Sequence, residues 1–155
     1  MTKYILVSGA SKGIGRAIVL HLTQAGFNVF AGVRKPEDGK ALQAEAGERC
    51  TPVILDVTRA EQIEAVRALI TAQVGEAGLF GLVNNAGIAH IGSLLTTEPE
   101  AMDRLYQVNI KGVYHCSQTV VAHLVEQGGG VVLNLCSIAA QMGLSDRFAY
   151  SMTKG

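Results

Sequence analysis

Residues 8–15 constrain the fold of this chain more than any other stretch, because they join an apolar run to an amphipathic one. Residues 4–7 before them are typical of a buried strand, and the apolar residues after them recur at helical spacing. Between these elements, Gly9, Gly13 and Gly15 allow the main chain to turn sharply and to approach a bulky ligand with no Cβ in the way. Free N–H groups and the positive end of the helix dipole favour an anionic group at this point. We therefore predict a strand, a turn and a helix that bind a phosphate-bearing ligand. The glycine spacing is neither Gly-x-Gly-x-x-Gly nor that of a P-loop, and it also fits a plain tight turn.

Apolar runs and helical patterns keep alternating along the rest of the chain. We expect strands over residues 4–7, 27–33, 51–57, 79–83 and 131–135. Helices are expected over residues 14–25, 36–47, 58–77 and 97–127, and a further helix is expected to begin near residue 150. This alternation is typical of a doubly wound α/β domain of Rossmann type, in which a parallel sheet lies between two layers of helices. With no linker, repeat or low-complexity segment, the chain is predicted to form a single domain over residues 1–155.

Local signals indicate where the helices begin and which faces they bury. Thr58 with Glu61, and Thr97 with Glu100, fit the capping box that satisfies free N–H groups at a helix start. The first helix is expected to bury its apolar positions, namely Ile14, Ala17, Ile18, His21, Leu22 and Ala25. The continuous apolar run 131–135 is of the type that is buried on both faces of a parallel sheet.

Composition and charge exclude several classes of partner. The 13 basic residues balance the 13 acidic ones and no Lys/Arg cluster stands out, so nucleic acid and anionic membranes are poor partners. No apolar run approaches membrane-spanning length and no signal-peptide pattern precedes the first strand, so we expect a cytoplasmic protein. The odd number and wide spacing of Cys50, Cys116 and Cys136 indicate reduced, core-type cysteines rather than disulfides or metal ligands, and no metal site is predicted.

The residues after the second strand indicate which dinucleotide the turn would bind. An acidic residue at the end of that strand holds both ribose hydroxyls of NAD, whereas this chain has Val33 followed by Arg34 and Lys35. Arg34 is able to bind a 2′-phosphate in a bidentate way, and Lys12 adds positive charge on the same side. The sequence therefore favours NADP(H) over NAD(H). The alternative, that Arg34 and Lys12 are ordinary solvated loop residues, stays open.

A phenol and an ammonium lie four residues apart at Tyr150 and Lys154, a spacing that puts both on one face of a helix. A neighbouring cation stabilises phenolate, so Tyr150 would become a usable acid and base near neutral pH. Because Tyr-x-x-x-Lys also occurs by chance in many helices, its meaning depends on the other motifs of the chain.

Several further motifs accompany this pair. They are Gly9, Gly13 and Gly15; Asp56; the run Asn84, Asn85, Ala86 and Gly87; Asn109; and Ser137. In their order and approximate spacing they resemble the short-chain dehydrogenase/reductase family, and the resemblance covers the chain from end to end. It implies reversible hydride transfer between an alcohol and a carbonyl, with NADP(H) as the cofactor and a small-molecule alcohol or ketone as the substrate.

The resemblance implies a cofactor-binding role for residues of the turn, the strand ends and the Tyr/Lys pair. These residues are Gly9, Ser11, Lys12, Gly13, Ile14, Gly15, Arg34, Asp56, Val57, Asn85, Ala86, Gly87, Tyr150 and Lys154. Among them, Asp56 would accept a hydrogen bond from the adenine amino group with Val57 alongside, or would merely begin the turn that Thr58 caps. Residues 85–87 would close the far side of the cofactor groove, or form a simple turn.

The resemblance also implies a catalytic role for Asn109, Ser137, Tyr150 and Lys154. Tyr150 would donate a proton to the substrate oxygen, while Lys154 would support the phenolate and hold the nicotinamide ribose. Ser137, at the end of the fifth strand, would polarise the carbonyl or be an inert strand-end serine. Asn109 is a poor helix former in mid-helix, so it would either hold a water that relays protons or be a satisfied buried amide.

The length of the chain departs most from the family it resembles, whose members run to roughly 250 residues. We expect the C-terminal strands of the fold to be missing from these 155 residues, which would leave strand 131–135 as an exposed apolar edge. The alternative to a reductase is a non-catalytic dinucleotide-binding fragment, or half of a split or cleaved reductase. Since family members commonly form dimers or tetramers, a homo-oligomer is expected for the full-length protein.

Overall fold

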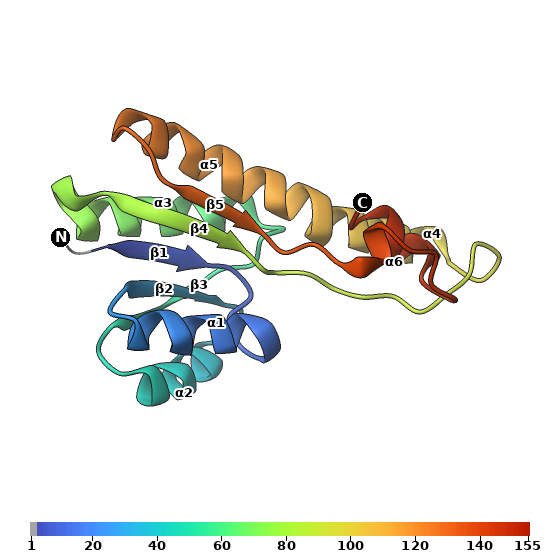
Figure 1. Cartoon of the computed structure of the whole chain (residues 1–155), viewed down its shortest axis with the longest axis horizontal. Coiled ribbons are helices and arrows are strands. Elements are labelled where there is room, and N and C mark those ends of the chain that lie inside the picture. Colours follow the sequence, from blue (N-terminus) through green and yellow to red (C-terminus); the bar gives the residue numbers. More distant parts are fainter. Residues whose placement is uncertain (1–2) are drawn as a thin grey trace.

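A five-stranded parallel sheet forms the centre of the computed structural model, which describes residues 3–155 (Figure 1). The strands are β1 (Tyr4–Val7), β2 (Asn28–Val33), β3 (Cys50–Ile54), β4 (Leu79–Asn84) and β5 (Val131–Asn134). They lie in the order β3-β2-β1-β4-β5, so the chain completes one half of the sheet at β3 and begins the other half at β4. This arrangement confirms the predicted doubly wound α/β fold. In such a sheet, ligands bind where the strand order reverses, beyond the carboxyl ends of β1 and β4.

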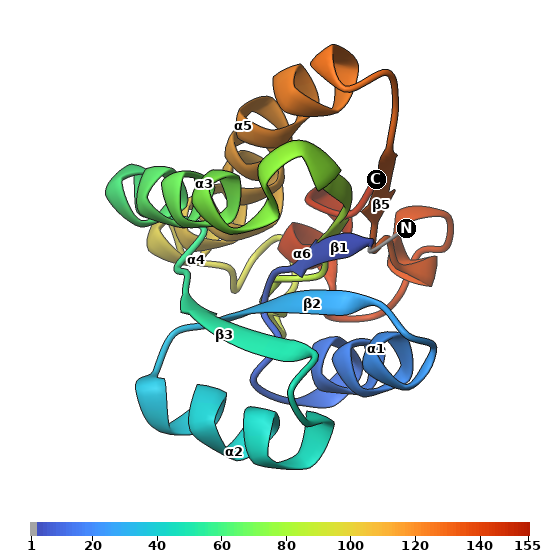
Figure 2. The same ribbon diagram turned by 90° about the vertical axis from the view of Figure 1, so that its left-hand side faces the viewer.

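Helices cover both faces of the sheet (Figure 1, Figure 2). They are α1 (Gly13–Gln24), α2 (Pro36–Ala46), α3 (Ala60–Val74), α4 (Pro99–Leu105), α5 (Gly112–Glu126) and α6 (Phe148–Met152), with the short turns η1 (Gly75–Ala77) and η3 (Ile138–Ala140) and the π-helical segment η2 (Tyr106–Lys111). α1 and α2 lie on one face and α3 and α5 on the other, while α4 and α6 extend beyond the carboxyl ends of the strands. Within residues 3–155, no helix has the length and apolar character that a membrane span requires.

Apolar side chains pack on both faces of the sheet, as expected for parallel strands. Successive residues of a strand point to opposite faces. Leu6 accordingly joins the core under α3 and α5, while Ile5 and Val7 join the core under α1 and α2. Each fully buried aliphatic side chain contributes about 1.5–3 kcal/mol. The two cores therefore hold β1 rigid at the place where the strand order reverses.

The buried face of α1 is rotated relative to the sequence prediction. Its buried residues are Gly15, Val19 and Thr23. The positions that were predicted to be buried but are exposed are Ile14, Ala17, His21 and Ala25. α1 approaches the preceding turn through Gly15, where a Cβ would overlap the main chain of that turn. This close approach, rather than the apolar periodicity, sets the rotation of the helix.

Both predicted capping boxes are wrong, because each threonine hydroxyl bonds elsewhere. Thr58 donates its hydroxyl to Asp56 Oδ1 at 2.7 Å, and α3 begins later, at Ala60, with no side-chain cap. Thr97 donates its hydroxyl to the main-chain oxygen of Ser93 at 2.7 Å, and α4 begins after it, also with no side-chain cap. Hydrogen bonds within a turn compete with helix caps for the same hydroxyl.

Two strands differ from their predicted form. β3 ends at Ile54 instead of continuing to residue 57, because residues 55–57 leave the sheet and line a cavity. β5 lies at the edge of the sheet, with Val131 51% and Leu133 50% exposed. The prediction that residues 131–135 are buried on both faces is therefore wrong for this strand, and the prediction of an exposed apolar edge is confirmed.

The three cysteines of the chain are free. Cys50 and Cys116 are buried, and burial raises the pKa of each thiol to about 11. Cys136 is exposed, so the prediction of a core-type cysteine is wrong at this position.

Candidate functional site

The carboxyl ends of β1 and β4 are joined by a reciprocal set of hydrogen bonds, which we call the Ser8–Asn85 clamp. The Ser8 hydroxyl accepts hydrogen bonds from the main-chain N–H groups of Asn85 at 3.1 Å and Ala86 at 3.0 Å. In return, Asn85 Nδ2 donates to the main-chain oxygens of Ser8 and Gly9, both at 2.9 Å. Ser8 is buried, so breaking the clamp would leave buried polar groups unpaired. The segment 84–87 is thereby fixed against the glycine turn.

The glycines of the turn are needed for different reasons. A Cβ on Gly9 would lie 2.7 Å from Ala86 Cα, which is closer than real Cβ atoms approach. A Cβ on Gly13 would have no neighbour within 4 Å, but the φ of +58° at this residue is one that favours glycine. The main chain therefore carries no Cβ at Gly9, Gly13 and Gly15, as close approach of a bulky anionic group requires.

A cavity of about 440 Å³ opens beside this turn. Its lining includes the predicted cofactor residues Gly9, Ser11, Lys12, Ile14, Gly15, Arg34, Asp56, Val57, Asn85, Ala86 and Gly87. Val33, Leu55 and Val108 supply apolar surface beside them. Of the other predicted cofactor residues, Gly13 lies outside this lining, and Tyr150 and Lys154 line a second cavity. Apolar walls with a few converging polar groups suit a ligand of the size of a dinucleotide.

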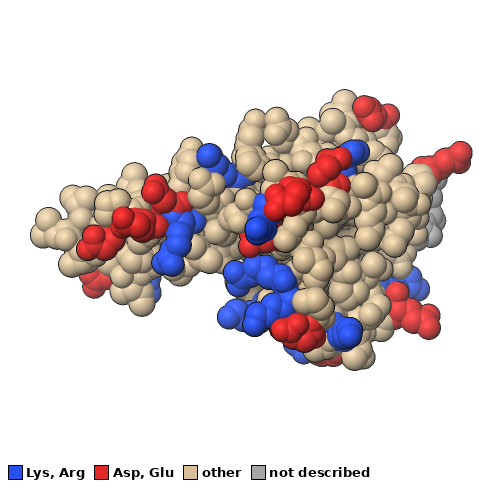
Figure 3. Space-filling view, turned by 180° about the vertical axis from the view of Figure 1, so that it is seen from behind, with Lys and Arg blue, Asp and Glu red and all other residues tan. Residues whose placement is uncertain are grey.

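Positive charge lines the larger cavity. Lys12 and Arg34 both contribute to its wall and are exposed. Figure 3 shows Lys and Arg side chains gathered near the middle of the face seen from behind. Partial burial raises the pKa of Asp56, but hydrogen bonds from Thr58 and the nearby Arg34 and Arg59 guanidiniums outweigh burial and hold that pKa below its ordinary value of 3.8. Asp56 is therefore an ionised acceptor at neutral pH.

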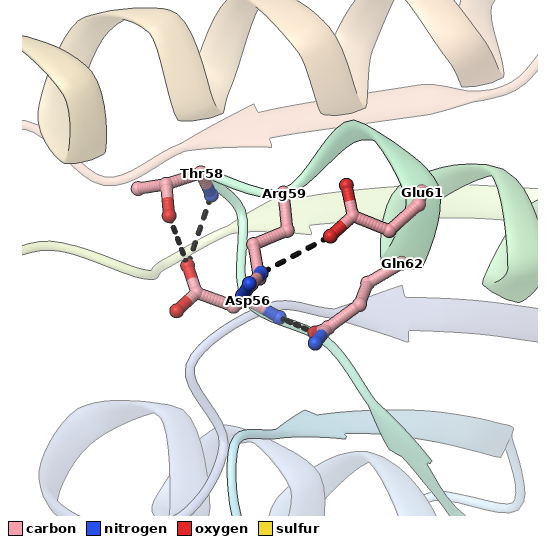
Figure 4. A network of polar contacts seen from close by, with 5 residues as sticks. All are labelled: Asp56, Thr58, Arg59, Glu61 and Gln62. Carbon is pink, nitrogen blue, oxygen red and sulfur yellow. Dashed lines mark hydrogen bonds and ion pairs between the residues drawn. The ribbon is translucent and has the colours of Figure 1, made fainter.

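Asp56 organises the turn between β3 and α3 (Figure 4). Its Oδ1 accepts hydrogen bonds from the Thr58 hydroxyl at 2.7 Å and the Thr58 main-chain N–H at 3.0 Å. The Asp56 main-chain N–H donates to Gln62 Oε1 at 2.7 Å, and Arg59 pairs with Glu61 at 3.1 Å beside it. Asp56 thus does begin this turn, which was one of the two interpretations of the sequence. Within residues 3–155 no donor bonds to its Oδ2, so that oxygen can still accept a hydrogen bond from a ligand.

A smaller cavity of about 190 Å³ adjoins the first one. Ile14, Asn85 and Gly87 line both cavities. Tyr150 and Lys154 line the smaller cavity only. The structure therefore brings the predicted phenol and ammonium together, and it places them at one end of the surface formed by the glycine turn.

Tyr150 and Lys154 lie in α6 and in the turn directly after it. Tyr150 lies within α6, which ends at Met152, and Lys154 lies in the turn that follows. Lys154 Nζ donates to the main-chain oxygen of Leu135, just after β5, at 3.0 Å. The same Nζ lies 3.4 Å from the place of a Cβ on Gly87, so the ammonium faces the segment 84–87.

Asn109 is a buried amide whose side-chain atoms are paired. Its exposed fraction is 5%, and it lies in η2 between α4 and α5. Oδ1 accepts from the Ile88 N–H at 2.9 Å, while Nδ2 donates to the Ile88 oxygen at 3.0 Å and to Thr153 Oγ1 at 2.9 Å. The satisfied buried amide, one of the two interpretations of the sequence, describes this side chain.

Ser137 lies at the start of η3, after β5. Its Oγ accepts a hydrogen bond from the Ala139 N–H at 3.2 Å. Ser137 is not part of the lining of either cavity, and the neighbouring Cys136 lines the smaller one instead. The role of Ser137 beside Tyr150 and Lys154 stays a prediction. Because Ser137 Oγ acts only as an acceptor in this bond, which caps the start of η3, the hydroxyl proton is free to be donated.

Sequence reasoning missed several residues of this site, Cys136 and Thr153 among them. Cys136 lines the cavity of Tyr150, and its position directly before Ser137 was the available signal. Thr153 bonds to Asn109, and no pattern in the sequence marks it, because the partner lies far away in the chain. Within residues 3–155, no three His, Cys, Asp or Glu side chains are grouped so that they could hold a metal ion.

Comparison with known proteins connects this geometry with one family. The family model described as short chain dehydrogenase matches residues 3–155. The 3-oxoacyl-[acyl-carrier-protein] reductase FabG of Staphylococcus aureus is 32% identical over 158 residues, which cover 99% of this chain and 63% of that protein. The chain thus spans 63% of the length of this relative.

Solved structures show the same relationship. A short-chain dehydrogenase from Streptomyces avermitilis matches with a TM-score of 0.93 and 33% identity, covering 99% of this chain and 56% of the other. A gluconate 5-dehydrogenase from Burkholderia cenocepacia, in complex with NADP and tartrate, matches with a TM-score of 0.88 and 29% identity, covering 99% and 60%. These matches include the glycine turn and both cavities, because they cover nearly the whole chain.

Proposed function

This chain belongs to the short-chain dehydrogenase family, and from this membership we propose that it forms the cofactor-binding and catalytic part of an NADP(H)-dependent oxidoreductase that interconverts an alcohol and a carbonyl. One observation carries the proposal. Tyr150 and Lys154 line a cavity that adjoins the cavity beside the glycine turn, and the two share Ile14, Asn85, Gly87 and Ile88. A dinucleotide held at the turn would therefore extend toward an acid/base pair.

The residues of the larger cavity fit NADP(H). The glycine turn offers main-chain N–H groups to a pyrophosphate without interference from side chains. Lys12 and Arg34 supply positive charge for a 2′-phosphate, and no acidic residue follows Val33 to repel it. Asp56 Oδ2 is available to the adenine amino group. The NADP bound to the similar gluconate 5-dehydrogenase supports the same preference.

The chain's own residues account for the proton transfer. The nicotinamide, when bound, supplies the hydride or accepts it in the reverse direction. The Tyr150 hydroxyl donates its proton to the carbonyl oxygen, and the Lys154 ammonium, held by the Leu135 oxygen, favours the phenolate that is left. The Ser137 hydroxyl, whose proton its cap does not use, orients the carbonyl oxygen.

Asn109 holds part of the cavity wall in place through Ile88. Its amide pairs with both main-chain groups of Ile88, and Ile88 lines both cavities. The asparagine thereby fixes the wall along which the cofactor would lie, whether or not it also holds a water that relays protons.

The proposal extends to the partners of the full-length protein. The substrate is a small-molecule alcohol or ketone, and the protein is a homo-oligomer. The outer side of α5 supports the second point, because Tyr114, Val121 and Val125 are apolar and exposed there. Apolar side chains grouped on one surface are typical of a contact with another protein surface.

NADPH oxidation by the full-length protein tests the proposal. The purified protein is titrated with NADPH and NADH by fluorescence, and it is then mixed with NADPH and a panel of aldehydes and ketones. We expect NADPH to bind more tightly than NADH and at least one carbonyl compound to be reduced. Absence of NADPH binding would contradict the cofactor assignment. Binding without turnover in either direction would favour a non-catalytic dinucleotide-binding protein.

A further inference from the structure

Thr153 joins two parts of the site through one buried hydroxyl. Its exposed fraction is 7%, and it directly precedes Lys154. Its Oγ1 accepts a hydrogen bond from Asn109 Nδ2 at 2.9 Å and donates to the main-chain oxygen of Tyr150, also at 2.9 Å. The hydroxyl thus connects η2 with α6, which carries Tyr150, and with the turn after it, which carries Lys154.

α6 contacts other segments at both of its ends. The helix has no side-chain cap at its start. At its start, the Phe148 N–H donates to the Gly92 oxygen at 3.3 Å. At its end, the anchors are the Thr153 hydroxyl and the bond from Lys154 Nζ to the Leu135 oxygen. These contacts tie the segment that carries Tyr150 to η2 and to the residues after β5.

Asn109 links the Thr153 anchor to the cofactor side of the site. The amide that donates to Thr153 also pairs with both main-chain groups of Ile88, which directly follows Gly87. A single side chain therefore joins the wall of both cavities to the turn after α6. η2 is a π-helical segment, and such segments are frequent at functional sites. Asn109 Nδ2 carries two protons, and one of them bonds to the Ile88 oxygen. Since Asn109 is buried, the other proton would have no ready partner without the Thr153 hydroxyl.

We propose that Thr153 is a positioning residue whose hydroxyl fixes the Tyr150 phenol and the Lys154 ammonium relative to the dinucleotide groove. This inference rests on the proposed reductase function. A misplacement of about 1 Å at a reacting group lowers the rate by about 100-fold. Loss of the hydroxyl therefore lowers kcat, while NADPH affinity changes far less, because the glycine turn and the Arg34 side chain lie on other elements.

Two matched pairs of variants in the full-length protein test this role. Thr153→Val keeps the branched shape and removes the hydroxyl, whereas Thr153→Ser keeps the hydroxyl and removes the methyl group. Thr153→Ala compared with Thr153→Ser isolates the hydroxyl in a smaller side chain. Turnover is expressed per NADPH-binding site, counted by fluorescence titration, so that unfolded molecules do not contribute. We expect Thr153→Val to lower kcat per site by about 10- to 100-fold with little change in substrate KM, and Thr153→Ser to restore kcat to near the wild-type value.

Three results would overturn the inference. The first is a wild-type kcat per site in Thr153→Val. The second is an equal loss in Thr153→Ser and Thr153→Val, which would mean that the hydroxyl is not what matters. If Thr153→Val does not fold, equal kcat values in Thr153→Ala and Thr153→Ser are decisive in the same way. Tyr150→Phe, measured in parallel, separates the two claims: a fully active Tyr150→Phe overturns the proposed function as well, whereas an inactive one with an active Thr153→Val overturns the positioning role alone.

Discussion

Replacing Gly9 by alanine is expected to disrupt the Ser8–Asn85 clamp, whereas the same change at Gly13 is expected to be mild. Both glycines have a positive φ, +66° at Gly9 and +58° at Gly13. Alanine therefore meets a backbone strain of about 1–2 kcal/mol at either position. Only at Gly9 does the added Cβ also meet main-chain atoms, at 2.7 Å from Ala86 Cα, and these cannot rotate away as a side chain can.

The additional loss at Gly9 follows from the hydrogen bonds of the clamp. The clamp has four hydrogen bonds: the Ser8 hydroxyl accepts two of them and Asn85 Nδ2 donates the other two. A net contribution of about 0.5–1.5 kcal/mol each means that losing half of them removes about 2 kcal/mol. Gly9→Ala is therefore expected to lower the free energy of unfolding by about 3–4 kcal/mol, and Gly13→Ala by about 1–2 kcal/mol.

Urea unfolding of the full-length protein, without cofactor, measures both values. The m-value should be unchanged, so that a shift of the midpoint reports stability alone. Equal losses in the two variants would refute the idea that close approach to Ala86 is what requires glycine at position 9. A Gly9→Ala variant as stable as the wild type would refute the clamp itself.

Three other changes test separate parts of the site. Arg34→Asp is expected to weaken NADPH binding by about 10-fold or more relative to NADH binding, because a charge-assisted contact to the 2′-phosphate is replaced by repulsion; an unchanged ratio of the two Kd values would contradict the assignment. The pKa of Asp56 lies below its ordinary value in the folded chain, so its carboxylate adds stability above about pH 4 that is lost as the pH falls through the folded pKa. Urea unfolding of wild type and Asp56→Asn should accordingly show a stability difference at about pH 7 that shrinks as the pH falls below about 4, and a constant difference would count against this pairing. Cys136 is exposed and is expected to react with iodoacetamide well before Cys50 and Cys116, because these two are buried and burial raises the pKa of each thiol to about 11. Peptide mapping that finds Cys50 or Cys116 labelled first would contradict the exposure of Cys136.

The architecture could be predicted because its signals are local. Each strand is an apolar run bounded by turn residues, and each crossover is a helix with its own apolar face. The glycine turn and the segment 84–87 end neighbouring strands in the sheet, so a parallel arrangement brings them together without further information. The larger cavity is lined as predicted for the same reason.

Other features depend on contacts that sequence periodicity does not encode. The rotation of α1 follows from the approach of Gly15 to the turn, which an apolar pattern cannot express. The Thr58 hydroxyl could bond either at the start of a helix or to the Asp56 carboxylate. It donates to Asp56 Oδ1 at 2.7 Å. Competition of this kind is decided by turn geometry.

The support behind the Tyr/Lys pair was the least predictable part. Asn109 and Thr153 are 44 residues apart in the chain, and they bond to each other because η2 lies beside the turn that follows α6. Ser137 was expected at the end of the fifth strand, whereas β5 ends at Asn134 and Ser137 lies at the start of η3, where its hydroxyl accepts the Ala139 N–H. The sequence thus predicts which strand Ser137 follows, whereas the turn after the strand determines where its side chain points.

Tyr150→Phe in the full-length protein tests the central claim most directly. The change removes one oxygen from the wall of the smaller cavity and leaves the glycine turn, Arg34 and Asp56 in place. NADPH titration should give a Kd close to that of the wild type, while turnover of a reducible carbonyl compound should fall by about 100-fold or more, because the proton donor is lost. Retained cofactor binding with lost turnover is the result that we predict. Wild-type turnover in Tyr150→Phe would contradict the assignment of Tyr150 as the acid and base.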